Sequence, residues 1–215
     1  MKILVIADVE EAWLEDYYDR ERMEGVELII SCGDLPARYL EHVVTMANVP
    51  LVYVWGNHDM GYVAHPPQGC ISIEGQLRDY KGVRIMGVGG SIKYNERVFG
   101  FTEKEMRRRM GKLALLARAT GGVDILVTHA PIRGFGDMED LPHRGFESFD
   151  YYVDKLKPAF MFHGHIHMNY GRVERVRKHP CGTTVVNACG AQILDIPDDV
   201  FPQRGKREPL LIPTI

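Results

Sequence analysis

Acidic, amide and imidazole side chains of this 215-residue chain gather in four short segments. The segments are Asp8-Val9-Glu10, Gly33-Asp34, Gly56-Asn57-His58-Asp59, and His129 together with Gly164-His165-Ile166-His167. Each segment follows an apolar, β-branched run that is typical of a strand, and ligands of α/β sheets bind where strands end and loops begin. Four strand ends that carry such side chains indicate one shared metal centre.

The candidate ligands are too many for a single ion. They are seven residues: Asp8, Glu10, Asp34, Asn57, His129, His165 and His167. A catalytic zinc ion takes three protein ligands and a water, whereas seven ligands suit two ions bridged by a carboxylate. Paired metals lie about 3.5–4 Å apart and hold the entering and leaving oxygens of an in-line displacement, for which a phosphate ester is the natural substrate. Oxygen and imidazole donors without thiolate favour Mn and/or Fe as the two divalent ions, with Zn, Ni or Mg as alternatives.

The first third of the chain predicts strands joined by crossover helices. Continuous apolar runs predict strands over 2–7, 27–31 and 51–55, and Pro36 is placed to begin a helix that reaches about Ala47. A helix over 11–22, with apolar Trp13, Leu14, Tyr17 and Tyr18, would complete a β-α-β-α-β order. That order is the signature of a sheet with parallel strands.

The rest of the chain predicts short strands around two helices. Thr102 and Glu105 form a capping-box pattern for a long helix that ends at Gly121-Gly122. A second helix is predicted over 147–156. Strands are predicted over 70–73, 76–80, 83–87, 123–128 and 158–162, and over 171–177, 183–188 and 191–196, the last three as a second sheet. We expect one domain over 1–196 and an extended or partly disordered Pro-rich tail over 197–215.

Composition excludes several classes of protein. The net charge is −3, and the basic residues are spread along the chain, so no nucleic-acid polymer is expected as a partner. Cys32, Cys70, Cys181 and Cys189 show no metal or redox spacing and fit free thiols of a reducing compartment. No apolar run suits a signal peptide or a membrane span. The sequence predicts a soluble cytoplasmic protein without a membrane partner.

The order of the motifs resembles that of the calcineurin-like metallophosphoesterases. That family has five motifs in this order: Asp-x-His, Gly-Asp, Gly-Asn-His-Asp, a Thr-His strand end and Gly-His-x-His. The resemblance covers roughly residues 1–196 of this chain. The stretch Ile125-Leu126-Val127-Thr128-His129-Ala130-Pro131 is most similar to a small subgroup, the metallophosphoesterase-domain (MPPED-like) proteins, reported as cyclic-nucleotide phosphodiesterases. The resemblance implies a four-layer α/β/β/α sandwich of two mixed sheets flanked by helices.

The resemblance also implies a role for each motif residue. Asp8 and His167 would bind the first metal, Asp34 would bridge, and Asn57, His129 and His165 would bind the second. A hydroxide between the metals would attack phosphorus. His58 would assist by giving a proton to the leaving oxygen or by stabilising charge on the phosphoryl group, and Asp59 would hold the His58 ring.

These roles predict a phosphoesterase that acts on a small phosphate ester, and a nucleotide-type diester is the favoured substrate. The alternatives are a phosphomonoesterase, including a protein phosphatase, and a scaffold that keeps the fold without the chemistry. A regulatory module that binds a nucleotide without turnover is a further alternative.

Glu10 departs from the family pattern, which has a histidine two residues after its first Asp. Two divalent ions together with Asp8, Asp34 and a hydroxide have a net charge of +1. An ionised Glu10 would lower this net charge to zero. Glu10 ligating the first metal is the favoured interpretation, because its oxygens are suitable donors. The alternatives are that Glu10 points away with water in its place, or that the first site is weak.

Other residues near the motifs have less specific patterns. Arg97, in a predicted loop, is a candidate contact for a phosphate oxygen or a base, and His143 is a candidate contact for substrate; a solvated surface residue is the alternative for each. Asn57 and His58 are the other predicted substrate contacts. His163 is expected to be a hydrogen-bonded core histidine, and His179 a surface one.

Overall fold

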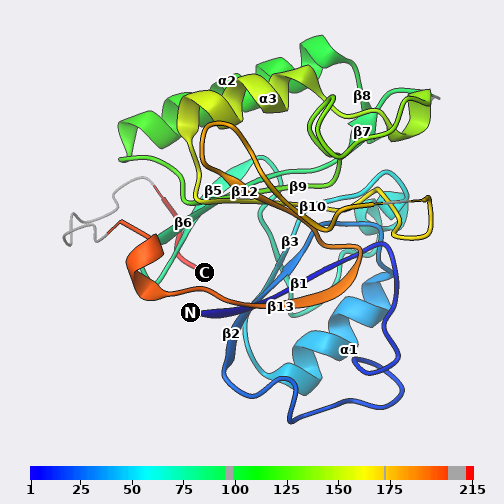
Figure 1. Ribbon diagram of the computed structural model, residues 1–215. Coiled ribbons are helices and arrows are strands. Elements are labelled where there is room, and N and C mark those ends of the chain that lie inside the picture. Colours follow the sequence, from blue (N-terminus) through cyan, green and yellow to red (C-terminus); the bar gives the residue numbers. More distant parts are fainter. Residues whose placement is uncertain (95–98, 172, 203–211) are drawn as a thin grey trace.

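A computed structural model describes residues 1–94, 99–171, 173–202 and 212–215 of the chain. Its elements form four layers: a helix, two stacked mixed sheets, and a pair of helices (Figure 1). This architecture is the predicted α/β/β/α sandwich. No helix within the described ranges is long and apolar enough to cross a membrane.

The first sheet contains five strands in the order β13-β1-β2-β3-β4. They are β1 (Lys2–Ala7), β2 (Val26–Ser31), β3 (Leu51–Tyr53), β4 (Ile71–Ser72) and β13 (Gly190–Asp195). Strands β1 to β4 are parallel, and β13 is antiparallel to β1. Because side chains alternate along a strand, Ile3 and Val5 of β1 enter the core between the sheets, while Leu4 and Ile6 pack with α1 (Ala37–Ala47).

The second sheet contains six strands in the order β11-β12-β10-β9-β6-β5. They are β5 (Gln76–Tyr80), β6 (Val83–Val88), β9 (Ile125–Thr128), β10 (Phe160–His163), β11 (Val176–Lys178) and β12 (Thr184–Asn187). Helices α2 (Glu103–Ala119) and α3 (Glu147–Leu156) cover its outer face (Figure 1). Thr102 and Glu105 form the predicted capping box at the start of α2.

Small elements lie in the loops between these layers. They are the short strands β7 (Ser91–Ile92) and β8 (Gly100–Phe101), and the 3₁₀ turns η1 (Asp59–Val63), η2 (Leu141–His143) and η3 (Asp198–Val200). Parts of the predicted tail pack on the domain, because Phe201 and Ile212 are buried in its two apolar cores.

Three sequence predictions of structure are wrong. The strand predicted over 171–177 is instead the short strand β11, Val176–Lys178. Residues 11–22 form turns and no helix. Among the apolar residues of this segment, only Leu14 is fully buried, and Tyr17 is 79% exposed. A short helix without a packed apolar face is marginal in water. The strand predicted over 191–196 belongs to the first sheet, where β13 pairs with β1, and not to the second sheet with β11 and β12.

Candidate metal centre

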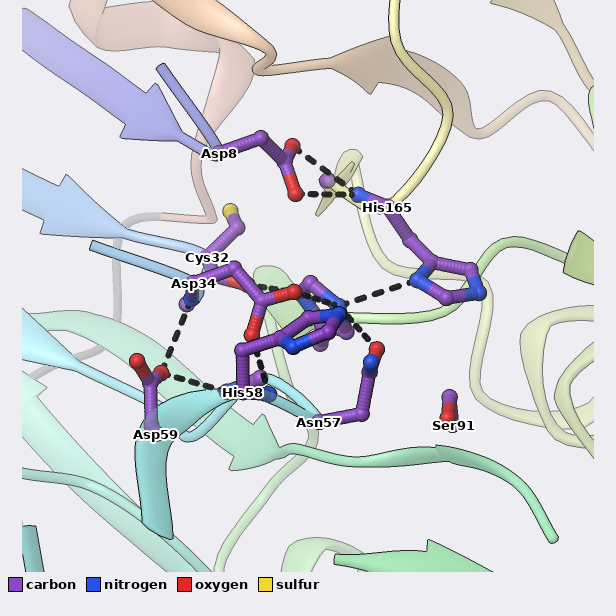
Figure 2. A network of polar contacts seen from close by, with 12 residues as sticks. Asp8, Cys32, Asp34, Asn57, His58, Asp59, Ser91 and His165 are labelled. Atoms are coloured by element: carbon purple, nitrogen blue, oxygen red, sulfur yellow. Dashed lines mark hydrogen bonds and ion pairs between the residues drawn. The ribbon is translucent and has the colours of Figure 1, made fainter. Parts of the chain in front are cut away.

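The carboxyl ends of five strands bring the predicted ligands together. Asp8, Asp34 and Asn57 follow the parallel strands β1, β2 and β3, and His129 and His165 follow β9 and β10 of the facing sheet. Parallel strands end at the same edge, so the two stacked sheets present both sets of side chains to one place (Figure 2). These five residues therefore lie at the strand ends where the sequence predicts them, and their binding of metal stays a prediction.

One ring nitrogen lies at the focus of the site. His129 Nε2 is 3.0 Å from Asn57 Oδ1, 3.1 Å from His165 Nδ1 and 3.3 Å from Asp34 Oδ2. Ligand atoms of Asp34, His129 and His165 all lie within 4.8 Å of one another, and the two histidines are buried. We call Asp34, Asn57, His129 and His165 the tight half of the centre.

Backbone carbonyls fix both imidazoles of the tight half. His129 Nδ1 is 2.8 Å from the Cys32 carbonyl oxygen, and His165 Nε2 is 2.7 Å from that of Pro142. A carbonyl accepts only, so these nitrogens carry protons, and in the neutral form of each ring the lone pair of the other nitrogen faces the site. Metal-binding histidines in proteins commonly donate their other N–H group in this way. Lone pairs and carboxylate oxygens that converge here need a cation between them, so the residues present fit a metal ion.

The backbone at the site adopts a rare conformation three times. Asp8, Asp34 and His165 have φ values of 63°, 57° and 71°, in the left-handed region. Such residues cost of the order of 1–3 kcal/mol each and persist where the surroundings determine them. Gly164 supports this geometry, because a Cβ atom there would lie 2.7 Å from Asp8 Oδ2. Three of the six described non-glycine residues with positive φ are thus candidate ligands.

Burial and charge shift the pKa values of the tight half in opposite directions. Burial alone would lower the pKa of His129, but the Asp34 carboxylate outweighs it and raises that pKa to about 9. Burial would raise the pKa of Asp34, but the charge and hydrogen bond of His129 hold it well below its usual range. Burial, and then the charge of His129, lowers the pKa of His165 to about 3. In the absence of a metal, a proton on His129 thus supplies the cation.

We call the other three predicted ligands, Asp8, Glu10 and His167, the open half of the predicted centre. Both carboxylate oxygens of Asp8 accept the backbone N–H group of His165, at 3.0 and 2.9 Å (Figure 2). Burial raises the pKa of Asp8 to about 7. The ring of His167 packs 5.0 Å from that of Tyr170. No cluster of candidate ligand atoms among the described residues includes any of these three side chains.

Glu10 has a partner that the sequence does not predict. Its Oε2 is 2.8 Å from a guanidinium nitrogen of Arg38 in α1, which also pairs with Glu15 at 2.7 Å. Ligation by Glu10 therefore requires its other oxygen or the opening of this ion pair. The role of Glu10 as a ligand stays a prediction.

His58 and Asp59 lie beside Asp34 on the loop after β3. The His58 backbone N–H group donates to Asp34 Oδ1 at 2.7 Å, and His58 is exposed. Asp59 Oδ2 accepts the backbone N–H groups of Asp34 and Gly56, at 2.8 and 2.7 Å (Figure 2). Asp59 therefore shapes the loop that carries the ligands, and its role in holding the His58 ring stays a prediction. Burial, and then the Asp34 charge, raises the pKa of Asp59 to about 6.

The predicted substrate contacts differ in how the structure places them. His143 lies at the site, with its ring 5.4 Å from that of His165 and its Nδ1 2.6 Å from Asp140 Oδ2. Arg97 lies outside the described residues. His163 is buried and contacts the Gly164 carbonyl oxygen at 2.9 Å, as expected of a core histidine.

Two tyrosines near the centre carry no signal of their own in the sequence. The Tyr94 hydroxyl is 3.4 Å from Asn57 Nδ2. The Tyr170 ring packs against both His143 and His167, at 4.9 and 5.0 Å. Only the closeness of Tyr170 to His167 in the chain hints at this position.

Comparison with known proteins identifies the family. The model of the calcineurin-like phosphoesterase superfamily domain matches residues 1–194, so the chain belongs to that family, which typically binds two divalent metals. No curated protein matches the chain significantly.

Solved structures share the fold at low sequence identity. TT1561 of Thermus thermophilus is 15% identical with a TM-score of 0.54, over 86% of this chain and 88% of that one. A hypothetical protein of the same organism is 16% identical with a TM-score of 0.52, over 87% and 75%. The 5'-nucleotidase of Candida albicans is 12% identical with a TM-score of 0.52, and the match covers 86% of this chain and 45% of the nucleotidase chain.

Proposed function

We propose that this protein is a dinuclear metal-dependent phosphoesterase that prefers small nucleotide-type diesters. The observation that carries the proposal is the set of donors around His129 Nε2, where two imidazole nitrogens, an amide oxygen and a carboxylate oxygen converge. Such a set suits a divalent cation that has both oxygen and nitrogen ligands. Asp34, Asn57, His129 and His165 would hold one ion, and Asp8 and His167, with Asp34, the other.

The chain's own residues would position the ester and move a proton. When bound, the two cations would supply an activated water and positive charge beside the phosphoryl oxygens. His58, which is exposed next to Asp34, would give a proton to the leaving oxygen. The backbone contacts of Asp59 hold the loop that carries His58 at a fixed position relative to Asp34.

Two pockets support a diester rather than a monoester. A pocket of about 360 Å³ adjoins Asp34 and His58 and is lined further by Leu35, Pro36 and Tyr62. A second pocket, of about 250 Å³, adjoins His167 and is lined by Val9, Met168 and Arg175 among others. A diester carries two substituents, and the pockets offer a place for each. The larger pocket is within the size range of small-ligand sites.

Paired assays test this proposal. The metal-free protein is reconstituted with Mn²⁺ or Fe²⁺ and assayed with bis-p-nitrophenyl phosphate and with p-nitrophenyl phosphate. We expect metal-dependent hydrolysis of both, with the larger kcat/KM for the diester. A larger value for the monoester identifies a phosphomonoesterase, and two bound ions without turnover identify a scaffold or a nucleotide-binding module.

His58 offers a matched pair of variants, because His65 lines the same pocket and is also exposed. We expect His58→Gln to lower kcat by about 100-fold or more at unchanged metal content, as loss of a general acid does. His65→Gln should retain most of the activity. Equal effects of the two substitutions would remove His58 from the chemistry.

A further inference from the structure

A cysteine, a histidine and an aspartate form a second polar cluster away from the metal centre. His179 Nδ1 lies 3.0 Å from Cys181 Sγ, and His179 Nε2 lies 2.9 Å from Asp150 Oδ1. Cys181 and His179 belong to the turn between β11 and β12, and Asp150 belongs to α3. The turn precedes β12, whereas Asn187 at the other end of β12 contacts the Ile166 carbonyl oxygen beside the metal ligands.

The prediction of a surface histidine at 179 is wrong, because its side chain is buried in this cluster. An aspartate oxygen faces Nε2, so that nitrogen carries the proton in the neutral ring. Nδ1 is then an acceptor, and the backbone N–H group of Cys181 also donates to it, at 3.3 Å. The basic nitrogen therefore faces the thiol, while Asp150 orients the ring. A nucleophile, a base and an orienting carboxylate in this order are the arrangement that activates thiols.

Among the described residues, no imidazole contacts the thiol of any other cysteine. Cys32 and Cys189 are buried. Cys70 is half-buried like Cys181, and each Sγ has a carbonyl oxygen nearby, that of Gln68 at 3.7 Å and that of Val153 at 3.6 Å, respectively. Burial together with Glu41 raises the pKa of Cys70 to about 12. Burial would also raise the pKa of Cys181, but its contacts with Thr183 and His179 outweigh burial and lower that pKa.

We propose that Cys181 is a reactive thiol that undergoes exchange with small organic disulfides, activated by His179 and Asp150. The proton of Sγ moves to His179 Nδ1, and the thiolate attacks one sulfur of the disulfide. The new bond joins Sγ to that sulfur, the S–S bond of the reagent breaks, and the released thiolate takes the proton from His179. Cys181 is oxidised to a mixed disulfide, and the other half of the reagent is reduced to a thiol.

A purely structural cluster would have the same contacts but a different reactivity. In that case the three residues would only attach the turn before β12 to α3, and the thiol would react like any other half-buried one. The rate of reaction at Cys181 relative to Cys70 separates the two roles, because both cysteines belong to one chain and experience the same folding equilibrium.

The experiment treats the folded protein at pH 7 with 2,2′-dithiodipyridine for a series of times, followed by alkylation and mass spectrometry of the peptides. We expect Cys181 to react at least about tenfold faster than Cys70, since the thiolate is the nucleophile. His179→Gln should abolish this advantage, and Asp150→Asn should reduce it. Asp154→Asn, an exposed substitution on the same helix, is the matched control and should leave the ratio unchanged.

Two outcomes would overturn the proposal. One is a Cys181 rate no greater than that of Cys70 in the unsubstituted protein. The other is an unchanged ratio in both His179→Gln and Asp150→Asn. If His179→Gln loosens the fold, both cysteines become reactive, and the decision then rests on Asp150→Asn, because the Asp150 side chain is 59% exposed and its loss removes one surface contact.

Discussion

The two halves of the candidate metal centre differ in how completely the protein arranges them. In the tight half, ligand atoms of Asp34, His129 and His165 lie within 4.8 Å of one another, and backbone carbonyls hold both rings. In the open half, each residue has another contact: Asp8 with a backbone N–H group, Glu10 with Arg38, and His167 with Tyr170. A pre-organised site loses less free energy to ordering on binding. We therefore expect the tight half to bind its ion first and more strongly.

The largest expected effect comes from His129→Gln. This substitution removes the nitrogen on which the tight half converges, so we expect loss of bound metal and a fall in kcat/KM of about 1000-fold or more. His167→Gln in the open half should instead retain one ion per chain. Elemental analysis by mass spectrometry counts the ions, and circular dichroism checks folding. Loss of both ions in His167→Gln with one retained in His129→Gln would reverse the comparison.

The pH dependence of metal uptake should differ between the halves. Asp34 raises the pKa of His129 to about 9, and burial raises that of Asp8 to about 7. A metal ion must displace a proton from each, so affinity rises with pH and a proton is released. The tight half should gain about tenfold per pH unit up to about pH 9, and the open half only up to about pH 7.

Isothermal titration with Mn²⁺ in buffers of different ionisation enthalpy measures both slopes and proton counts. Equal slopes between pH 7 and 9 for the first and second ion would contradict a separate proton at His129.

A smaller effect is expected from Glu10→His. The substitution replaces an anionic residue with a neutral nitrogen donor, so the centre gains one positive charge and attracts an anionic phosphate more strongly. We expect kcat/KM for bis-p-nitrophenyl phosphate to be preserved or raised, by up to about tenfold. A large loss of both metal content and turnover would show that Glu10 has a specific role in the open half.

What the sequence could predict depends on whether a feature is set by local pattern or by long-range contacts. The strands β1, β2 and β9 are mostly apolar runs, and a candidate ligand lies within three residues of the end of each, so local pattern locates Asp8, Asp34 and His129. The ion pair of Glu10 with Arg38 joins residues 28 positions apart, and no local pattern encodes it. The placement of β13 beside β1 is also a long-range pairing.

Residues 11–22 have helical apolar spacing, but Trp13 and Tyr18 are only partly buried against the core and Tyr17 is exposed, which only the packed structure reveals. The spacing of apolar residues therefore predicts a helix here, although Leu14 is the one fully buried apolar side chain of the segment.

The smallest effect is expected from Arg38→Gln. Arg38 is 67% exposed, so losing its ion pairs should cost less than about 1 kcal/mol of stability. If Glu10 is a ligand, freeing its carboxylate should strengthen binding of the second ion by a few-fold, because the ion no longer competes with a guanidinium. Glu15→Gln removes the other partner of Arg38 and leaves Glu10 paired, so it should not strengthen binding. In Glu10→Gln the further change Arg38→Gln should have no effect on the second ion. A gain that persists in this double variant would assign it to the removal of a nearby positive charge and leave Glu10 outside the centre.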